Sequence, residues 1–241
     1  MRGALSLALM AFAVTLVVRF PARWAAPLLP RGLHCEALNG SLWSGSCSGL
    51  SHGGSALGDA SWSVELLPLL SAHLGVHLDL SGPGGFARGE LILGFGGALK
   101  ARDLQLDLPL SSALVSSFPA GAHAHLQGTV ARLDWSGKYL AALQGELAVQ
   151  NLVGAQGQNL GNYQVSFAPV TGADLPVGEV HDAGGPLRMA AVLQLTRDPG
   201  YLLKGRIAPR PSATPDITEM LQYLGPPDAS GQRDFAVQGL F

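Results

Sequence analysis

The sequence predicts a mainly β protein: an N-terminal transmembrane helix, then a long, curved antiparallel β meander with one or two short helices. Composition is the first observation that predicts it. The 241 residues include 32 Gly and 16 Pro, and 47% are hydrophobic whereas only 13% are charged. Low charge with many apolar residues excludes disorder, and abundant Gly among short apolar runs favours a turn-rich β protein. The second observation is period-two alternation from Leu57 onward, and the third is an apolar N-terminus.

The apolar N-terminus contains 16 consecutive uncharged residues between Arg2 and Arg19. A spanning helix needs roughly 17–25 residues, so the run is slightly short. Arg2 and Arg19 can extend toward the headgroups, and Phe20 and Trp24 suit the membrane interface. A cleaved signal peptide is the alternative, but no good small-x-small cleavage site follows the apolar run.

We therefore expect an uncleaved membrane anchor at residues 1–22 and a periplasmic β domain at residues 23–241. Two features of the sequence favour opposite orientations of this anchor in the membrane. Three arginines follow the apolar run and only Arg2 precedes it, so the positive-inside rule argues weakly for the opposite topology. The cysteine pair favours an exported domain.

Cys35 and Cys47 are the two cysteines of the chain. In an exported domain such a close pair predicts a disulfide, which would contribute on the order of 3 kcal/mol in the chain-entropy model. Two free buried thiols are the first alternative. A metal site with His34 and His52 is the second, although the spacing matches no common zinc pattern.

A tryptophan lies between two glycines inside the cysteine loop, in the stretch Gly40-Ser41-Leu42-Trp43-Ser44-Gly45. An aromatic side chain of this size gains most of its stabilisation by burial, and the glycines allow a tight turn or a close approach. This pattern predicts a first strand whose Trp43 fills one end of a β core. The other interpretation is a family signature.

Alternation predicts the strands of the body, and turn clusters separate them. The clearest strands contain Leu104–Leu108, Leu143–Val149, Tyr163–Phe167, Met189–Leu195 and Phe235–Phe241.

Two segments between the strands are predicted to be helical. Leu110–Phe118 lies between two prolines, and Ile217–Leu224 follows Thr214 as an N-cap and Pro215 at the first helical position. Residues 171–186 are predicted to form a long loop.

Catalytic chemistry is poorly represented, and we expect no enzyme, no cofactor and no metal. Gly45–Gly49 resembles a nucleophile elbow only superficially, because Cys47 is central and no strand-turn-helix pattern surrounds it. An envelope hydrolase with Cys47 as nucleophile and His34 or His52 as base is the enzyme hypothesis to test. His123 and His125 share one strand face without a third ligand, which favours solvent-facing histidines. No basic stripe is present, so nucleic acid is not an expected partner.

Several stretches together resemble the type II secretion system protein N family of the general secretion pathway. They are the Gly40–Gly45 motif after a short anchor, the segment around Trp62, residues 200–207 leading to Pro215–Gly225, and Ser230–Arg233 before a final strand. The resemblance covers most of the chain, although Cys35 and Cys47 do not match the family pattern. It implies structural roles for the motif residues Gly40, Leu42, Trp43, Gly45, Trp62 and Gly205.

The resemblance implies a single pass through the cell inner membrane, with the bulk of the chain in the periplasm. It also implies an accessory role in assembling or stabilising the machinery that exports folded proteins across the outer membrane. The implied partners are other type II secretion components of the inner membrane or periplasm, and membrane lipid. The same plan is similar to AsmA-like proteins. The alternative is therefore an envelope protein whose curved sheet binds or shuttles lipid.

Overall fold

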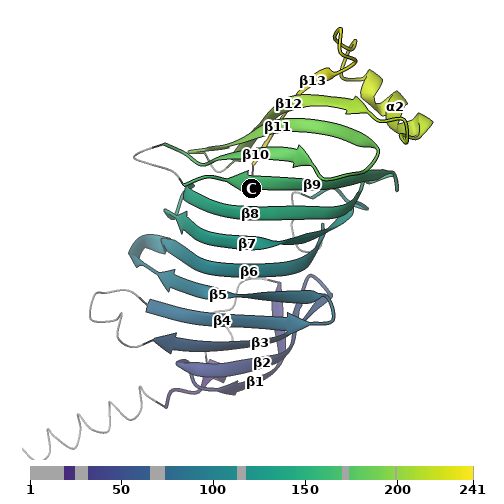
Figure 1. Ribbon diagram of the computed structural model, residues 1–241. Helices are drawn as coiled ribbons and strands as arrows, with labels where there is room; N and C mark the ends of the chain where they lie inside the picture. Colours follow the sequence, from purple (N-terminus) through teal and green to yellow (C-terminus); the bar gives the residue numbers. More distant parts are fainter. Residues whose placement is uncertain are drawn as a thin grey trace, which may run out of the picture.

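The computed structural model describes residues 19–24, 32–65, 74–112, 118–169, 174–198 and 200–240. These residues form one sheet of 13 antiparallel strands whose spatial order is the chain order (Figure 1). The prediction of a long antiparallel meander is confirmed. The strands are β1 (Leu33–Gly40), β2 (Ser44–His52), β3 (Ser55–Glu65), β4 (Leu74–Gly82), β5 (Gly85–Leu93), β6 (Leu99–Ser111), β7 (His123–Trp135), β8 (Leu140–Val153), β9 (Asn159–Phe167), β10 (Val177–Asp182), β11 (Leu187–Thr196), β12 (Gly200–Pro209) and β13 (Arg233–Leu240).

Strand register places apolar residues on one face of the sheet and polar residues on the other. Leu104 of β6 lies opposite Val130 of β7, whereas Gln105 lies opposite Thr129. The alternation continues from strand to strand, because side chains directly opposite in an antiparallel pair point to the same face. The sequence pattern therefore produces a continuous apolar face.

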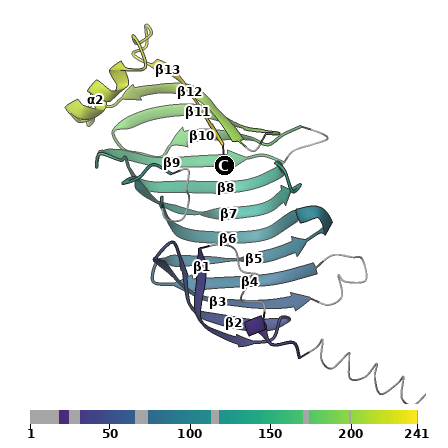
Figure 2. The same cartoon turned by 180° about the vertical axis from the view of Figure 1, so that it is seen from behind.

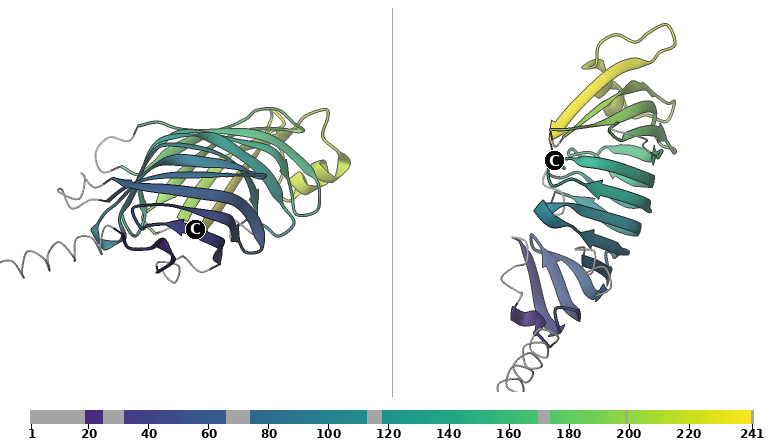
Figure 3. Two further views of the ribbon diagram at one scale, coloured as in Figure 1. Left: turned by 90° about the horizontal axis from the view of Figure 1, so that it is seen from below. Right: turned by 90° about the vertical axis from the view of Figure 1, so that its left-hand side faces the viewer.

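The sheet bends around its apolar face. Register shifts interrupt the ladders between Cys47 and Leu50 in β2–β3 and between Arg88 and Glu90 in β5–β6. Such irregularities bend the strand that carries them and increase the local twist. The first strands curl, so that β1 lies in front of its neighbours in Figure 2, and Figure 3 shows the bend of the sheet from below.

A helix covers the apolar face at the C-terminal end of the sheet. Helix α2 (Pro215–Gln222) begins after Thr214, with Pro215 in its first turn, and Gly225 follows it with φ +95°. The predicted helix is confirmed, although the Thr214 side chain makes no capping hydrogen bond. Ile217 and Leu221 are buried against Leu187 and Ile207 of the sheet.

Two sequence expectations are wrong in part. Leu110 and Ser111 belong to strand β6 rather than to the expected helix, because they continue the ladder opposite Ala124 and His123; residues 113–117 of that helix lie outside the described residues. The expected loop at residues 171–186 contains strand β10, which pairs with β9 and β11.

Of the predicted anchor at residues 1–22, residues 1–18 lie outside the described part of the chain. No helix within the described residues has the length and apolar character needed to span a bilayer.

Candidate functional site: an apolar cavity at the N-terminal end of the sheet

The curled N-terminal strands enclose an apolar cavity of about 440 Å³. The cavity lies on the concave face, and strands β1 to β4 together with residue Ala22 form its wall. The lining residues are Ala22, Leu33, Cys35, Leu38, Leu42, Cys47, Leu50, Leu57, Ala60, Trp62, Leu78 and Leu80. These side chains carry one polar group among them, the indole N–H of Trp62, so the cavity suits an apolar occupant.

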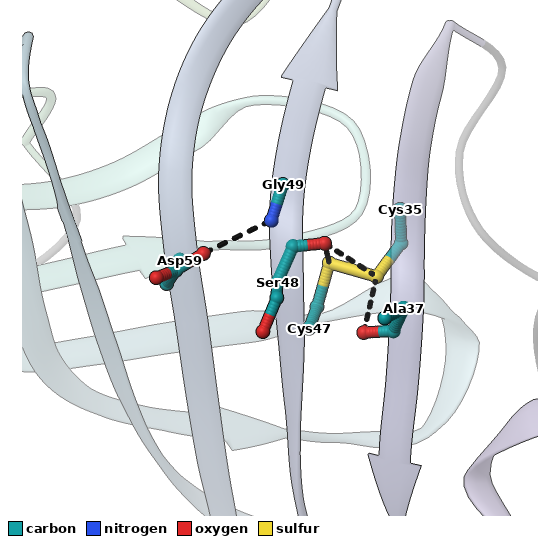
Figure 4. Close-up of a disulfide and its surroundings, with 6 residues drawn as sticks. All are labelled: Cys35, Ala37, Cys47, Ser48, Gly49 and Asp59. Atoms are coloured by element: carbon teal, nitrogen blue, oxygen red, sulfur yellow. Dashed lines mark hydrogen bonds between the residues drawn. A yellow bond between two sulfur atoms is a disulfide. The ribbon is translucent and has the colours of Figure 1, made fainter.

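Cys35 and Cys47 form a disulfide in the cavity wall (Figure 4). Their Cα atoms lie 5.8 Å apart, and the bond joins strands β1 and β2. Beside it, the Gly49 backbone N–H donates to the Asp59 carboxylate at 2.9 Å, which ties β2 to β3 (Figure 4). The bond holds the edge strand to its neighbour in the curled N-terminal part of the sheet. Because Cys47 has no thiol in this state, the hypothesis that it is a nucleophile is wrong for the structure.

The motif glycines build the tight turn between β1 and β2. Gly40 has φ +88°, a left-handed conformation that L side chains rarely adopt. The Ser41 hydroxyl accepts hydrogen bonds from the backbone N–H groups of Trp43 at 3.3 Å and Ser44 at 3.2 Å. Gly45 lies against the Trp62 ring, because a Cβ atom at Gly45 would be 2.5 Å from Trp62 Cζ2.

Trp62, rather than Trp43, is the aromatic residue of the cavity. Trp62 lies opposite Leu78 in the β3–β4 ladder, and its indole N–H donates to the Leu42 carbonyl at 3.2 Å. Trp43 is half-buried in the turn, where its carbonyl accepts from the Val64 N–H at 2.7 Å. The expectation that Trp43 lies in a first strand and fills one end of the core is therefore wrong. Its backbone closes the turn, and Trp62 supplies the apolar ring.

The chain enters the sheet at the rim of this cavity. The Leu42 N–H donates to the Phe20 carbonyl at 3.0 Å, and Pro21 forms a bridge with Ser41. Ala22 is 1% exposed and lines the cavity, whereas Trp24 is 67% exposed beside Phe20, with ring centroids 6.0 Å apart. Apolar and aromatic groups are thus gathered where the N-terminal segment meets the sheet.

The residues singled out from the sequence lie in three places. Cys35, Leu42, Cys47 and Trp62 line the cavity, and Gly40 and Gly45 shape the turn above it. Gly205 is remote, in strand β12, where it lies opposite Ala191 and Phe235. A Cβ atom at Gly205 would overlap the Ala190 carbonyl oxygen and Ala191 Cβ, so its role is close packing of neighbouring strands.

Sequence reasoning did not identify the remaining wall of the cavity. The signal was present in the alternation of β4, in which Leu78 and Leu80 point to the apolar face. The alternation alone does not predict the curvature of the sheet, which brings Leu33 and Leu38 of β1 close to Leu78 and Leu80.

The opposite face of the sheet is polar. It carries a shallow hollow of about 600 Å³ that includes His77, Asp79, Arg88 and Glu90. Pairs form across this face, such as His77 with Glu65 at 2.8 Å. His125 is half-buried and hydrogen-bonded to Asp107, so it is less solvent-facing than expected. Across the described residues, no group of three or more His, Cys, Asp or Glu side chains is placed to hold a metal ion.

The fold and the site define a single-layer curved-sheet protein with an apolar hollow beside its N-terminal entry. The sequence matches the model of the family Type II secretion system (T2SS), protein N over residues 31–236, which includes nearly all of the sheet. The chain belongs to this family.

Two relatives carry the same description. Type II secretion system protein N of Aeromonas hydrophila is 25% identical over 97% of this chain and 96% of its own length. The protein of that name from Vibrio cholerae serotype O1 is 27% identical over 93% of this chain and 92% of its own length. No solved structure matches the chain.

Proposed function

We propose that this type II secretion component is an accessory protein of the cell inner membrane. It helps to assemble or stabilise the machinery that exports folded proteins across the outer membrane, and it is not an enzyme. Residues 1–22 anchor it and residues 23–241 form a periplasmic domain. The observation that carries the proposal is the family match over residues 31–236, which includes nearly all of the sheet.

The geometry supports a docking role. A single-layer sheet has two large faces, and among the described residues helix α2 packs on the apolar one, which leaves the polar face available to other proteins. The proposed partners are other type II secretion components of the inner membrane or periplasm. The apolar rim of Phe20, Trp24 and Leu42 suits contact with the membrane surface, where aromatic side chains are favoured.

A secretion assay in cells lacking the chromosomal gene tests this role. The wild-type gene on a plasmid is expected to restore the extracellular level of an exported protein, and mass spectrometry of the co-purifying proteins is expected to identify secretion components. Trp62→Ala, which removes the ring of the cavity, should lower the restored level. Val192→Ala, an exposed residue of β11, is the control. Unchanged export in the deletion strain, with no secretion component in the eluate, would contradict the proposal.

The apolar cavity favours a second candidate function, the holding of a lipid acyl chain. Burying a CH₂ group stabilises by about 0.8 kcal/mol, so a chain of several groups would bind measurably in a wall of Leu side chains. The test is lipid extraction from the purified full chain followed by mass spectrometry. Ala60→Leu, which takes up part of the cavity, should lower the bound lipid, whereas Val192→Leu on the other face should not. Equal lipid in both variants would eliminate this candidate.

A further inference from the structure

The sheet is open, and its two edge strands differ in how they are protected. Among the described residues, β1 pairs only with β2 and β13 pairs only with β12. An edge strand presents unpaired N–H and C=O groups, and proteins usually shield it with charged residues, proline or a covering segment.

Strand β1 carries two of these protections. The exposed Glu36 lies at its centre, and residues 20–22 lie against the turn that follows it, through the bridge of Pro21 with Ser41. Strand β13 has neither along most of its length. Its two charges, Arg233 and Asp234, are at its start, and the run from Phe235 to Leu240 contains no charge and no proline.

We propose that the outer edge of β13 pairs with β13 of a second copy of this chain. The two strands would be antiparallel and related by a twofold axis normal to the sheet through Val237. This pairing goes beyond the proposed function and does not depend on it.

The proposal rests on the register in which β13 pairs with β12. Phe235, Val237 and Gly239 lie opposite Gly205, Leu203 and Tyr201 of β12 and share the apolar face. A twofold axis through Val237 places Phe235 opposite Gly239 and Val237 opposite itself. Each pair therefore keeps the apolar faces of the two sheets on one side.

The pairs on the polar face are also compatible. Asp234 would lie opposite Leu240, and Ala236 opposite Gln238, so no like charges meet across the interface. Asp234 already lies opposite Arg206 of β12 within the sheet. Val237 and Leu240, which are 47% and 70% exposed, would gain neighbours on the partner strand. This self-complementarity selects a second copy over a foreign strand, and it is the property that a twofold interface requires.

Cysteine cross-linking of the full chain in membranes tests the axis directly. The described cysteines are joined in a disulfide, so the thiol of Val237→Cys has no other free thiol among the described residues to compete with it. Opposed residues of an antiparallel pair have Cα atoms about 4.5–5.5 Å apart, within disulfide reach. Val237→Cys is expected to give a covalent dimer after mild oxidation. Val192→Cys on the polar face of β11 is expected to remain monomeric.

The register has its own test. Ala236→Cys and Gln238→Cys in separately tagged copies should cross-link to each other more than either does to itself. Val237→Lys places two charges on the axis and should weaken dimerisation roughly two- to fivefold, whereas Val237→Thr should preserve it. A detergent-corrected mass of one chain for the wild type would overturn the proposal. Cross-linking of Val237→Cys to a different protein would overturn it in favour of a foreign strand.

Discussion

The two ends of the sheet have the same alternating pattern but different interiors. At the C-terminal end, helix α2 covers the apolar face, and Ile217 and Leu221 are 2% and 1% exposed. At the N-terminal end the described residues place only a short helical turn at residues 22–24 beside that face, where Ala22 lines the cavity. The strands curl around it, a disulfide joins the first two, and a cavity of about 440 Å³ remains.

A filled interior and a hollow one respond differently to mutation. Close packing makes the C-terminal end sensitive to any change in volume, because neighbours have no space into which to move. The cavity end has space already, and its shape depends on the strand curvature and the disulfide. The C-terminal end of the sheet therefore contributes most to stability, whereas the N-terminal end has room for an apolar occupant.

The sharpest test of this contrast compares two leucines. Leu221→Ala removes a fully buried side chain and should lower the free energy of unfolding by about 3 kcal/mol, the middle of the range for buried leucines. Leu78→Ala, in the cavity wall, should cost about 1 kcal/mol, because part of its surface already faces empty space. Denaturant unfolding followed by tryptophan fluorescence measures both values.

Thr218→Ala is the control for helix α2, because Thr218 is exposed on the same helix and should change stability little. Equal losses for Leu221→Ala and Leu78→Ala would show that the two ends are packed alike, and the contrast would fail.

Removal of the disulfide should loosen the cavity end selectively. The bond spans 12 residues of sequence, for which constraint of the unfolded chain contributes about 3 kcal/mol. In the Cys35→Ala, Cys47→Ala double variant, amide hydrogen exchange should accelerate in β1 to β3 and remain unchanged in β11 to β13. Acceleration spread evenly over all strands would show that the disulfide supports the whole sheet instead of the curl.

Much of this architecture could be predicted from the sequence, for identifiable reasons. Period-two alternation fixed which residues share a face, and Thr214 with Pro215 marked the start of the helix. Strand β10 was not expected because it is only six residues long, has Gly178 at a buried position, and lies in a segment rich in Gly and Pro that is typical of a loop. Its pairing comes from the neighbouring strands β9 and β11, which a local pattern does not contain.

The cavity could not be predicted, because it depends on curvature instead of composition. Trp43 and Trp62 each lie among small and polar residues in the sequence, and only strand register places Trp62 opposite Leu78 on the concave face. The register shift in β2 between Cys47 and Leu50 contains Gly49, whose φ of +67° is typical of a bulge, but a glycine in the sequence does not give the resulting shape of the sheet. Sequence reasoning thus identified several cavity residues without identifying the cavity.

A matched pair of alanines tests the available space. Ala191 is buried in β11 against Gly205, so Ala191→Val should lower the free energy of unfolding by about 1–2 kcal/mol through overpacking. Ala60 lines the cavity, and Ala60→Val should be neutral or stabilising by about 0.5 kcal/mol. The same denaturant unfolding assay measures the change in free energy of unfolding for both variants. A loss for Ala60→Val equal to that for Ala191→Val would mean that the hollow is closed in solution.

A pH dependence of stability is expected at the filled end. Burial, with a smaller contribution from the Asp182 charge, raises the pKa of Tyr163 to about 12 from its ordinary value of 10.0. The Tyr163 hydroxyl donates to the Leu160 carbonyl at 2.6 Å, which also favours the protonated form. A folded-state pKa above the unfolded one gives stability that is complete below pH 10 and is lost between pH 10 and about 12.

Tyr163→Phe removes this titration, so its free energy of unfolding should fall less steeply than that of the wild type across the same interval. The difference in stability between the two proteins should be constant at neutral pH and narrow by about 1–2 kcal/mol as the pH approaches 12. Tyr139→Phe, in the turn between β7 and β8, is the control for general alkaline effects. Parallel pH profiles for Tyr163→Phe and the wild type would show that the hydroxyl titrates as in an unfolded chain. The surroundings of the Tyr163 hydroxyl would then be as open to solvent as the cavity. The close packing of the C-terminal end would therefore not extend to β9.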